Sequence, residues 1–222
     1  MDNSLIKFPQ RKIKKNYRSI TGHFPSIKNN TSIGFESKLE KAHFLALEFD
    51  NEIISYQEQP QIEIFFNGKT QIYSADCYIK RVKNASKKDS IVEVKYTNEI
   101  EKRKDYFEKR FEAATISANK LNLDFEIYTE ENDSEIYLDN LDFLYRYKLY
   151  PIENKYENQI INLVKKNKKI SAFDLANLIS QNLTEYGLIS NCIWDLVCKE
   201  KLKSDLLSAK VTMNSFMELV NE

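Results

Sequence analysis

Alternation of apolar and polar residues predicts several short strands in the first half of the chain. The β-prone runs occupy residues 53–56, 62–66, 71–80, 90–96 and 123–128. Asn67-Gly68 joins two of them and is a strong hairpin signal, because both residues tolerate the positive φ of a tight turn. We therefore expect residues 71–80 to form the second arm of a hairpin.

Helical periodicity predicts three helices between and after these strands, at residues 35–49, 98–121 and 134–147. In the second of them, Phe107, Phe111, Ala114 and Ala118 recur every three or four residues and form one apolar stripe. Strands that alternate with amphipathic helices indicate a mixed α/β domain.

The chain changes character after Pro151. Periodicity predicts helices near 156–164, 172–180 and 188–200, then strand-like pieces at 202–206 and 209–211 and a last helix from Thr212. Three helices and a short hairpin are the outline of a winged helix. The third helix has few cations, which favours protein docking over DNA reading.

With 222 residues, we predict an irregular arm at 1–30, a catalytic domain at 31–150 and a winged-helix-like domain at 151–222.

Charge is balanced overall, with 33 basic and 33 acidic residues, but cations gather in two places. In the arm they surround Tyr17, a pattern that suits phosphate contact and base stacking, although a solvated terminus explains it equally well. The second group begins the helix that follows strand 90–96. The candidate DNA-binding residues are Arg11, Lys12, Lys14, Lys15, Arg18, Lys102 and Arg103.

Composition excludes several chemistries. Four scattered glycines cannot form a Walker loop or a dinucleotide-binding turn. Two histidines make a histidine-rich zinc site improbable. The three cysteines form no CxxC pair, which predicts buried thiols in a reducing cytoplasm. No apolar run reaches the roughly 20 residues of a membrane span, and no signal peptide is visible.

Any catalytic chemistry must therefore come from carboxylate and lysine side chains. Asp76, Glu93 and Lys95 form a motif of this kind. Glu93 and Lys95 are two residues apart in a strand, so their side chains point to the same face. A charged pair inside an apolar strand is costly unless something compensates it. A divalent cation between Asp76 and Glu93 would do so, and D…(D/E)-x-K is the signature of metal-dependent nucleases. Glu36 and Glu40 border the apolar stripe of helix 35–49 and are further candidate ligands, although surface glutamates are commoner at such positions.

The chain resembles the TnsA endonuclease subunit of heteromeric cut-and-paste transposases over most of residues 10–130. The similar segments are Ser26-Ile-Lys, Phe35-Glu-Ser-Lys-Leu-Glu40, Leu47-Glu-Phe-Asp50, Gln59-Pro60, Ser74-Ala-Asp76 and Glu93-Val-Lys95. Glu93 stands where some members have glutamine, and Ser74-Ala75 replaces a proline that often precedes the aspartate.

The resemblance implies a restriction-endonuclease-like mixed sheet flanked by helices, in the PD-(D/E)xK superfamily. It also implies a bacterial, cytoplasmic protein that hydrolyses the 5′ strand of double-stranded DNA at transposon ends. A DDE-type (TnsB-like) transposase would process the other strand, and the C-terminal domain would engage a TnsC-like AAA+ regulator. By position, Glu40 corresponds to the family's helix glutamate, with Glu36 as the alternative.

The resulting mechanistic hypothesis uses one or two Mg²⁺ ions, which Mn²⁺ can replace, because a site made of oxygen ligands selects a hard cation. Asp76 would be the central ligand, with Glu93, Glu40 and the carbonyl of Val94 as the others. Lys95 would orient the attacking water and stabilise charge at the phosphate.

Two alternatives stay open. A restriction or repair nuclease of the same fold would cut without a transposase or a regulator. A non-enzymatic adaptor that bridges DNA and protein would lack metal binding, so Mn²⁺ calorimetry separates it from a nuclease.

Overall fold

The computed structural model describes residues 6–8 and 20–220. The chain divides into two compact units, Met1–Asp133 and Ser134–Glu222. Helix α4 (Glu135–Leu149) therefore belongs with the C-terminal unit, where it packs against α7 (Leu183–Cys198). The boundary that the sequence suggests, at Pro151, lies after this helix and inside the second unit.

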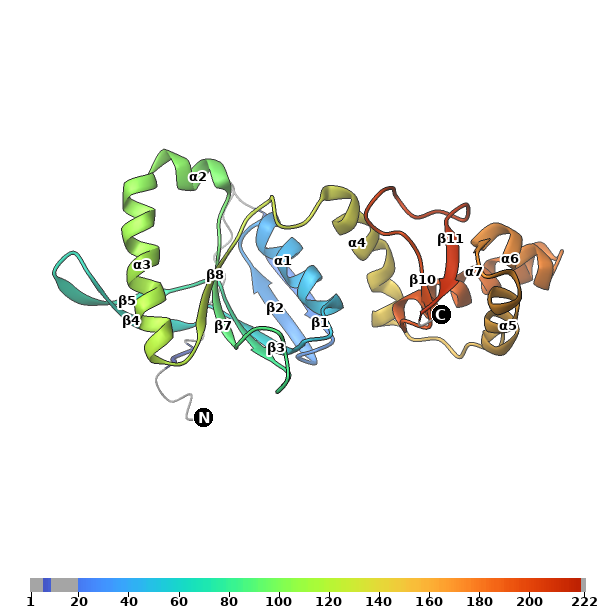
Figure 1. Cartoon of the computed structure of the whole chain (residues 1–222), viewed down its shortest axis with the longest axis horizontal. Helices are drawn as coiled ribbons and strands as arrows, with labels where there is room; N and C mark the ends of the chain where they lie inside the picture. Colours follow the sequence, from blue (N-terminus) through green and yellow to red (C-terminus); the bar gives the residue numbers. More distant parts are fainter. Residues whose placement is uncertain (1–5, 9–19, 221–222) are drawn as a thin grey trace. The chain divides into compact units, whose positions relative to one another are not determined.

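A mixed four-stranded sheet forms the centre of the first unit. Its strands lie in the order β3 (Ile53–Glu58), β6 (Cys77–Arg81), β7 (Ser90–Val94) and β8 (Asp124–Tyr128). The pairs β3–β6 and β6–β7 are antiparallel, whereas β7 and β8 are parallel. A parallel pair needs a long crossover, and here it runs through α2 (Thr97–Lys102) and α3 (Lys104–Lys120) (Figure 1).

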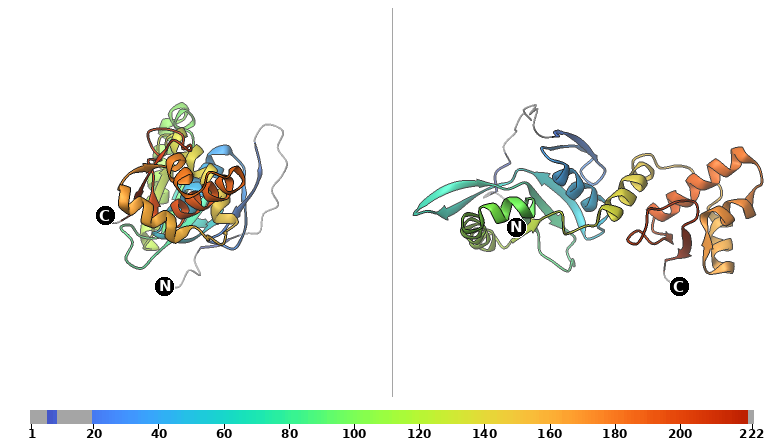
Figure 2. Two further views of the ribbon diagram at one scale, coloured as in Figure 1. Left: turned by 90° about the vertical axis from the view of Figure 1, so that its right-hand side faces the viewer. Right: turned by 90° about the horizontal axis from the view of Figure 1, so that it is seen from above.

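Two hairpins accompany this sheet. In the first, β1 (Gly22–Ser26) pairs with β2 (Thr31–Phe35). In the second, β4 (Gln61–Phe66) pairs with β5 (Lys69–Ser74), and this hairpin extends away from the central sheet alongside α3 (Figures 1 and 2). Its turn is the predicted Asn67-Gly68, with φ of 51° and 77°, which confirms the hairpin.

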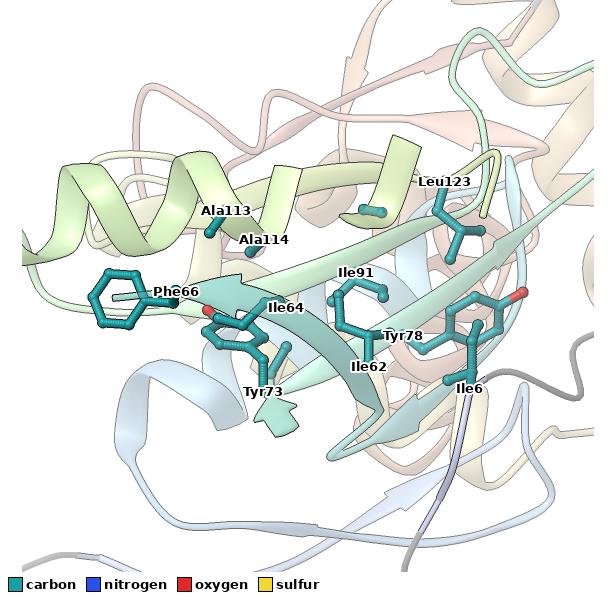
Figure 3. Close-up of a cluster of buried hydrophobic side chains, with 12 residues drawn as sticks. Ile6, Ile62, Ile64, Phe66, Tyr73, Tyr78, Ile91, Ala113, Ala114 and Leu123 are labelled. Atoms are coloured by element: carbon teal, nitrogen blue, oxygen red, sulfur yellow. The ribbon is translucent and has the colours of Figure 1, made fainter. Parts of the chain in front are cut away.

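The core of the first unit lies between the second hairpin, β7 and α3. Ile62, Ile64 and Tyr73 face α3 from the hairpin, and Ile91 meets them from β7 (Figure 3). The facing side of α3 carries small residues such as Ala114, which is fully buried, so the helix approaches the strands closely. Helix α1 (Lys38–Phe49) packs separately, against β1, β2, β3 and β7.

Three expectations for this unit are wrong. Residues 71–80 are two strands, β5 and β6, because the chain changes partners between Ser74 and Cys77. The supposedly irregular arm at 1–30 contains β1, whose turn uses Asn30 at a φ of 51°. The helix expected at 98–121 is interrupted at Arg103, which has φ −134° and ψ 37°.

The second unit contains α4, α5 (Glu157–Asn167), α6 (Ala172–Ile179) and α7 around a small sheet. The sheet has the order β10 (Leu202–Lys203), β11 (Phe216–Leu219), β9 (Ile170–Ser171), and both pairs are antiparallel. Ser171 caps α6 as expected, since its hydroxyl accepts from the N–H of Asp174. Asn182 starts α7 at Leu183, five residues earlier than predicted.

The end of this unit also differs from expectation. Residues 216–219 form β11 where a helix from Thr212 was expected, and residues 209–211 are not a strand. Buried Asn140 on α4 explains the path of this segment. Its amide nitrogen donates to the carbonyls of Leu206 and Ala209, and its oxygen accepts from the N–H of Val211.

Cys77, Cys192 and Cys198 carry free thiols, and the first two are buried. Burial raises the pKa of each of them, that of Cys198 to about 12. Within residues 6–8 and 20–220, none of the helices combines the length and apolar character needed to cross a membrane.

Candidate active site

Asp76 lies at the point where the chain leaves the β4–β5 hairpin and enters the central sheet as β6. Its N–H donates to the carbonyl of Val92 (3.0 Å), and its carbonyl accepts from the N–H of Gln59 (3.0 Å). Its Oδ2 accepts a 2.7 Å hydrogen bond from the N–H of Val94. In the described part of the chain, no donor is hydrogen-bonded to Oδ1. The main chain is therefore held at β7 while one carboxylate oxygen stays available.

Glu93 and Lys95 lie on one face of the strand next to Asp76, as their spacing predicts. Lys95 Nζ is 3.5 Å from Glu93 Oε1. Glu93 is only 8 % exposed, and its Oε2 accepts a 2.7 Å hydrogen bond from the phenol of Tyr73. The N–H of Lys95 donates to the carbonyl of Tyr128 (2.9 Å) and so continues the parallel pairing.

Glu40 sits at the start of α1, in a reciprocal cap with Ser37. The N–H of Glu40 donates to Ser37 Oγ (3.0 Å), and that hydroxyl donates to Glu40 Oε1 (3.0 Å). Oε2 accepts from the N–H of Glu36 (2.9 Å). This arrangement is a variant of the capping box with Glu40 at N3, in which the carboxylate reaches the N–H of Glu36, one residue before the N-cap. Both oxygens of Glu40 thus already have a structural role.

Electrostatic interactions connect Glu40, Asp76, Glu93 and Lys95. Burial raises the pKa of Asp76 to about 8, and the negative charges of Glu93 and Glu40 contribute in the same direction. The Val94 N–H and Lys95 oppose this shift. Burial also raises the pKa of Glu40, against its cap hydrogen bonds and Lys95. The side chains that influence one another in this way come from α1, from the β5–β6 junction and from the end of β7.

Lys95 is the cation of this group. Burial acts to lower its pKa, but the carboxylates of Glu93 and Asp76 outweigh that effect. The pKa of Lys95 is therefore raised and the ammonium stays charged at neutral pH. With a pKa of about 8, Asp76 keeps its proton at neutral pH beside the other two carboxyl groups and the one lysine. A divalent cation could take the place of that proton, which suits the site to binding one.

The donor chemistry fits a hard divalent ion, because the available atoms are carboxylate oxygens. The three carboxylates are nevertheless not arranged as a complete set of metal ligands. In residues 6–8 and 20–220, no group of three or more histidine, cysteine, aspartate or glutamate side chains has the geometry to hold a metal ion. The capping bonds of Glu40 account for part of this, since they turn both of its oxygens toward the helix end.

The predicted DNA-binding residues of the arm, Arg11, Lys12, Lys14, Lys15 and Arg18, lie outside the described residues. Lys102 and Arg103 are exposed where α2 meets α3. The Arg103 guanidinium lies 4.2 Å from the ring centroid of Tyr106, so it has an intramolecular partner.

Sequence reasoning missed Tyr73 and Ser37. Tyr73 has no motif signal, because its contact with Glu93 depends on the hairpin folding against β7. Ser37 did have a signal, since Ser-x-x-Glu before an apolar run predicts a capping box. We expected the carbonyl of Val94 to be a metal ligand. In the structure Val94 contacts the site through its N–H, which donates a hydrogen bond to Asp76.

A mixed α/β domain with an aspartate at one strand and Glu-x-Lys on its neighbour is consistent with a nuclease fold. Residues 50–130 match the family described as TnsA-like endonuclease N terminal, so this segment is similar to the endonuclease domain of that family. The match runs from just before β3 to just after β8, and it includes Asp76, Glu93 and Lys95 but not Glu40. A search of curated proteins found no match.

Proposed function

We propose that this chain is the metal-dependent DNA endonuclease subunit of a Tn7-type transposase, which hydrolyses a phosphodiester bond at each transposon end. The TnsA-like domain implies a nuclease, a DNA substrate and Tn7-type partners. The observation that carries the catalytic assignment is the position of Asp76 beside Glu93 and Lys95. Burial raises the pKa of Asp76, and the negative charges of Glu93 and Glu40 add to this effect, which is costly to the fold and useful for binding a cation.

Asp76 and Glu93 are the residues that would hold Mg²⁺ or Mn²⁺. Each has one oxygen fixed by a donor within the protein, namely the Val94 N–H or the Tyr73 phenol. Each keeps its other oxygen for a ligand. Glu40 can join them once an oxygen leaves the Ser37 cap. When bound, such an ion supplies Lewis acidity at the scissile phosphate.

Lys95 would place positive charge where the phosphate binds. Its ammonium lies near Glu93 Oε1. Its backbone is held by the hydrogen bond from its N–H to the carbonyl of Tyr128. From this position it can orient a water for attack and stabilise charge on the phosphoryl oxygens.

The test is cleavage of duplex DNA carrying a transposon end, by the full chain with its transposase partner, in Mg²⁺ and in Mn²⁺. Asp76→Asn keeps an oxygen that accepts from Val94 and removes the charge, so the fold is preserved. We expect a loss of about 10²–10³-fold in rate for Asp76→Asn and for Lys95→Ala. Asp124→Asn, on β8, is the matched control and should cut like wild type. Cleavage by Asp76→Asn at the wild-type rate refutes the assignment.

The C-terminal unit would serve protein docking. Its order of elements, α5, β9, α6, α7, β10 and β11, supports the winged-helix comparison. Residues 170–198 contain no lysine or arginine, which is unsuitable for a helix in a DNA groove. The exposed apolar residues of α6 and α7 instead suit a protein surface. They are Phe173, Leu178, Leu183 and Leu188.

A TnsC-like AAA+ regulator is the partner we propose for this surface. Leu183 is 89 % exposed, so Leu183→Ser should not affect folding. We expect it to weaken binding of the regulator about tenfold while cleavage without the regulator is unchanged. An exposed residue of β10, Lys203→Ser, provides the control. Equal binding by wild type and Leu183→Ser would contradict this placement.

A further inference from the structure

Tyr73 connects the β4–β5 hairpin to the acidic site, by which we mean Glu40, Asp76, Glu93 and Lys95. It lies on β5, three residues before Asp76, and is fully buried. Its phenol donates a 2.7 Å hydrogen bond to Oε2 of Glu93 on β7. The hairpin and the central sheet are separate sheets, so this bond joins two parts of the unit that share no strand pairing.

The ring of Tyr73 is held from several sides. Ile62 pairs with it across the hairpin, and the ring of Phe125 meets it edge to face with centroids 6.1 Å apart. On α3, the Arg110 guanidinium lies 4.9 Å from the centroid of the ring. Arg110 is itself fixed by donating to the hydroxyl of Tyr106 (2.6 Å). The phenol therefore has little freedom to leave Glu93.

The two oxygens of Glu93 consequently differ. Oε2 is occupied by the phenol of Tyr73, a strong and buried donor. Oε1 faces Lys95 Nζ at 3.5 Å, which is longer than a well-formed charged hydrogen bond. Oε1 is thus the oxygen left for a ligand from outside the protein. Asp76 repeats the pattern, with Oδ2 bonded to the Val94 N–H.

We propose that Tyr73 is a positioning residue for metal binding, which fixes Glu93 so that Oε1 alone coordinates a hard divalent cation. This inference rests on the proposed function. Removing the phenol leaves Oε2 without its donor, and Glu93 is then free to turn toward Lys95. The closer ion pair competes with the metal, so affinity falls even though every ligand is still present. Partners of this kind commonly change metal affinity 10–100-fold.

The chain contains a matched control for a purely structural effect. Tyr56 on β3 is also buried, and its phenol donates a 2.8 Å hydrogen bond to Oε1 of buried Glu48. Tyr56→Phe and Tyr73→Phe therefore each remove one hydroxyl and one buried tyrosine–glutamate hydrogen bond. They differ in whether the glutamate belongs to the acidic site. Glu48 Oε1 also keeps a second donor, the hydroxyl of Ser26 (2.6 Å). Thermal unfolding of both variants checks that each one folds and loses a similar amount of stability.

The experiment is calorimetric titration of the full chain with Mn²⁺ alone, without DNA, on wild type, Tyr73→Phe, Tyr56→Phe and Asp76→Asn. We expect Tyr73→Phe to bind Mn²⁺ about 10–100-fold more weakly than wild type, and Tyr56→Phe to match wild type. In cleavage, the Mn²⁺ concentration for half-maximal rate should rise by the same factor in Tyr73→Phe. Its rate at saturating Mn²⁺ should stay within about threefold of wild type.

The failures can be told apart. If wild type binds Mn²⁺, Asp76→Asn does not, and Tyr73→Phe binds within threefold of wild type, only the role of Tyr73 is wrong. Equal weakening by Tyr73→Phe and Tyr56→Phe overturns it too, because the effect is then one of general stability. If wild type itself gives no binding heat and no Mn²⁺-dependent cleavage, the proposed function fails and this inference fails with it.

Discussion

The backbone N–H of Val94 donates a 2.7 Å hydrogen bond to Oδ2 of Asp76. This bond crosses from β7 to the junction of β5 and β6, so the aspartate is fixed by the strand that carries Glu93 and ends just before Lys95. Because the donor is a backbone atom, no side-chain substitution on β7 removes it directly. The orientation of the aspartate is thus a property of the sheet.

Adding Mn²⁺ should stabilise wild type and not Asp76→Asn. A ligand that binds only the folded state, at about 100 times its dissociation constant, adds about 2.7 kcal/mol to the free energy of unfolding. Differential scanning fluorimetry in EDTA and in Mn²⁺ measures the effect as a rise in melting temperature. Asp124→Asn should behave like wild type. The same rise in Asp76→Asn would show that the ion binds elsewhere.

Lowering the pH should destabilise the protein through His43. This side chain of α1 is 5 % exposed, and both ring nitrogens are buried without a hydrogen-bond partner among the described residues. Burial lowers its pKa to about 3, an effect that Glu126 opposes. In the unfolded chain it takes up a proton near pH 6.5. Unfolding is therefore favoured as pH falls from 6.5 toward 3, by up to about 1.4 kcal/mol per pH unit.

His43→Leu should remove this part of the pH dependence. Urea denaturation at several pH values between 4 and 8 gives the free energy of unfolding. The variant should show a shallower slope below pH 6.5 than wild type. His23 is exposed on β1, and His23→Gln serves as the control for the loss of a histidine. Parallel profiles for wild type and His43→Leu would contradict the prediction.

Ser37→Ala should lower stability and raise the cleavage rate at low Mn²⁺, because it releases an oxygen of Glu40 for the metal. The substitution removes two hydrogen bonds of the capping box around Glu40, which costs about 1 kcal/mol, and it leaves Glu40 less constrained. Ser134 caps α4 by accepting from the N–H of Tyr137 (3.1 Å). Ser134→Ala should cost a similar free energy of unfolding without changing the cleavage rate. If both variants cut like wild type, the orientation of Glu40 has no bearing on the reaction.

Asn140→Ala should destabilise the C-terminal unit by at least about 3 kcal/mol. Asn140 is 2 % exposed, and its loss leaves two carbonyls and the N–H of Val211 without their partner. Each such buried group costs about 1–3 kcal/mol. Exposed Asn214 lies in the same segment, and Asn214→Ala should change stability by less than about 0.5 kcal/mol. Chemical denaturation followed through Trp194 fluorescence reports on this unit.

Local sequence patterns were sufficient to predict those structural features whose physical cause lies within a few residues. The side-by-side placement of Glu93 and Lys95 follows from the two-residue repeat of a strand, and the Asn67-Gly68 turn follows from the backbone freedom of its residues. The break at Asp76 could not be predicted this way. It depends on Val92, Val94 and Gln59, which reach Asp76 only after the sheet has formed.

The C-terminal segment shows the same limit. A helix from Thr212 was a reasonable interpretation of the local pattern, but Met217 and Phe216 pair with β9 and Asn140 binds the chain before them. Asp76, Glu93 and Lys95 could be proposed as site residues from the sequence, and that assignment stays a prediction. The tyrosine that orients the glutamate could not, because nothing local connects Tyr73 to Glu93.

The interruption between β5 and β6 has a consequence for how such a domain can vary. The register of β5 is set by β4, whereas the register of β6 is set by β3 and β7. Residues added or lost at the tip of the hairpin, near Gly68, alter the length of an outlying ribbon and leave the spacing of Asp76 and Glu93 untouched. Relatives can therefore differ in this ribbon and still place the aspartate and the glutamate in the same way.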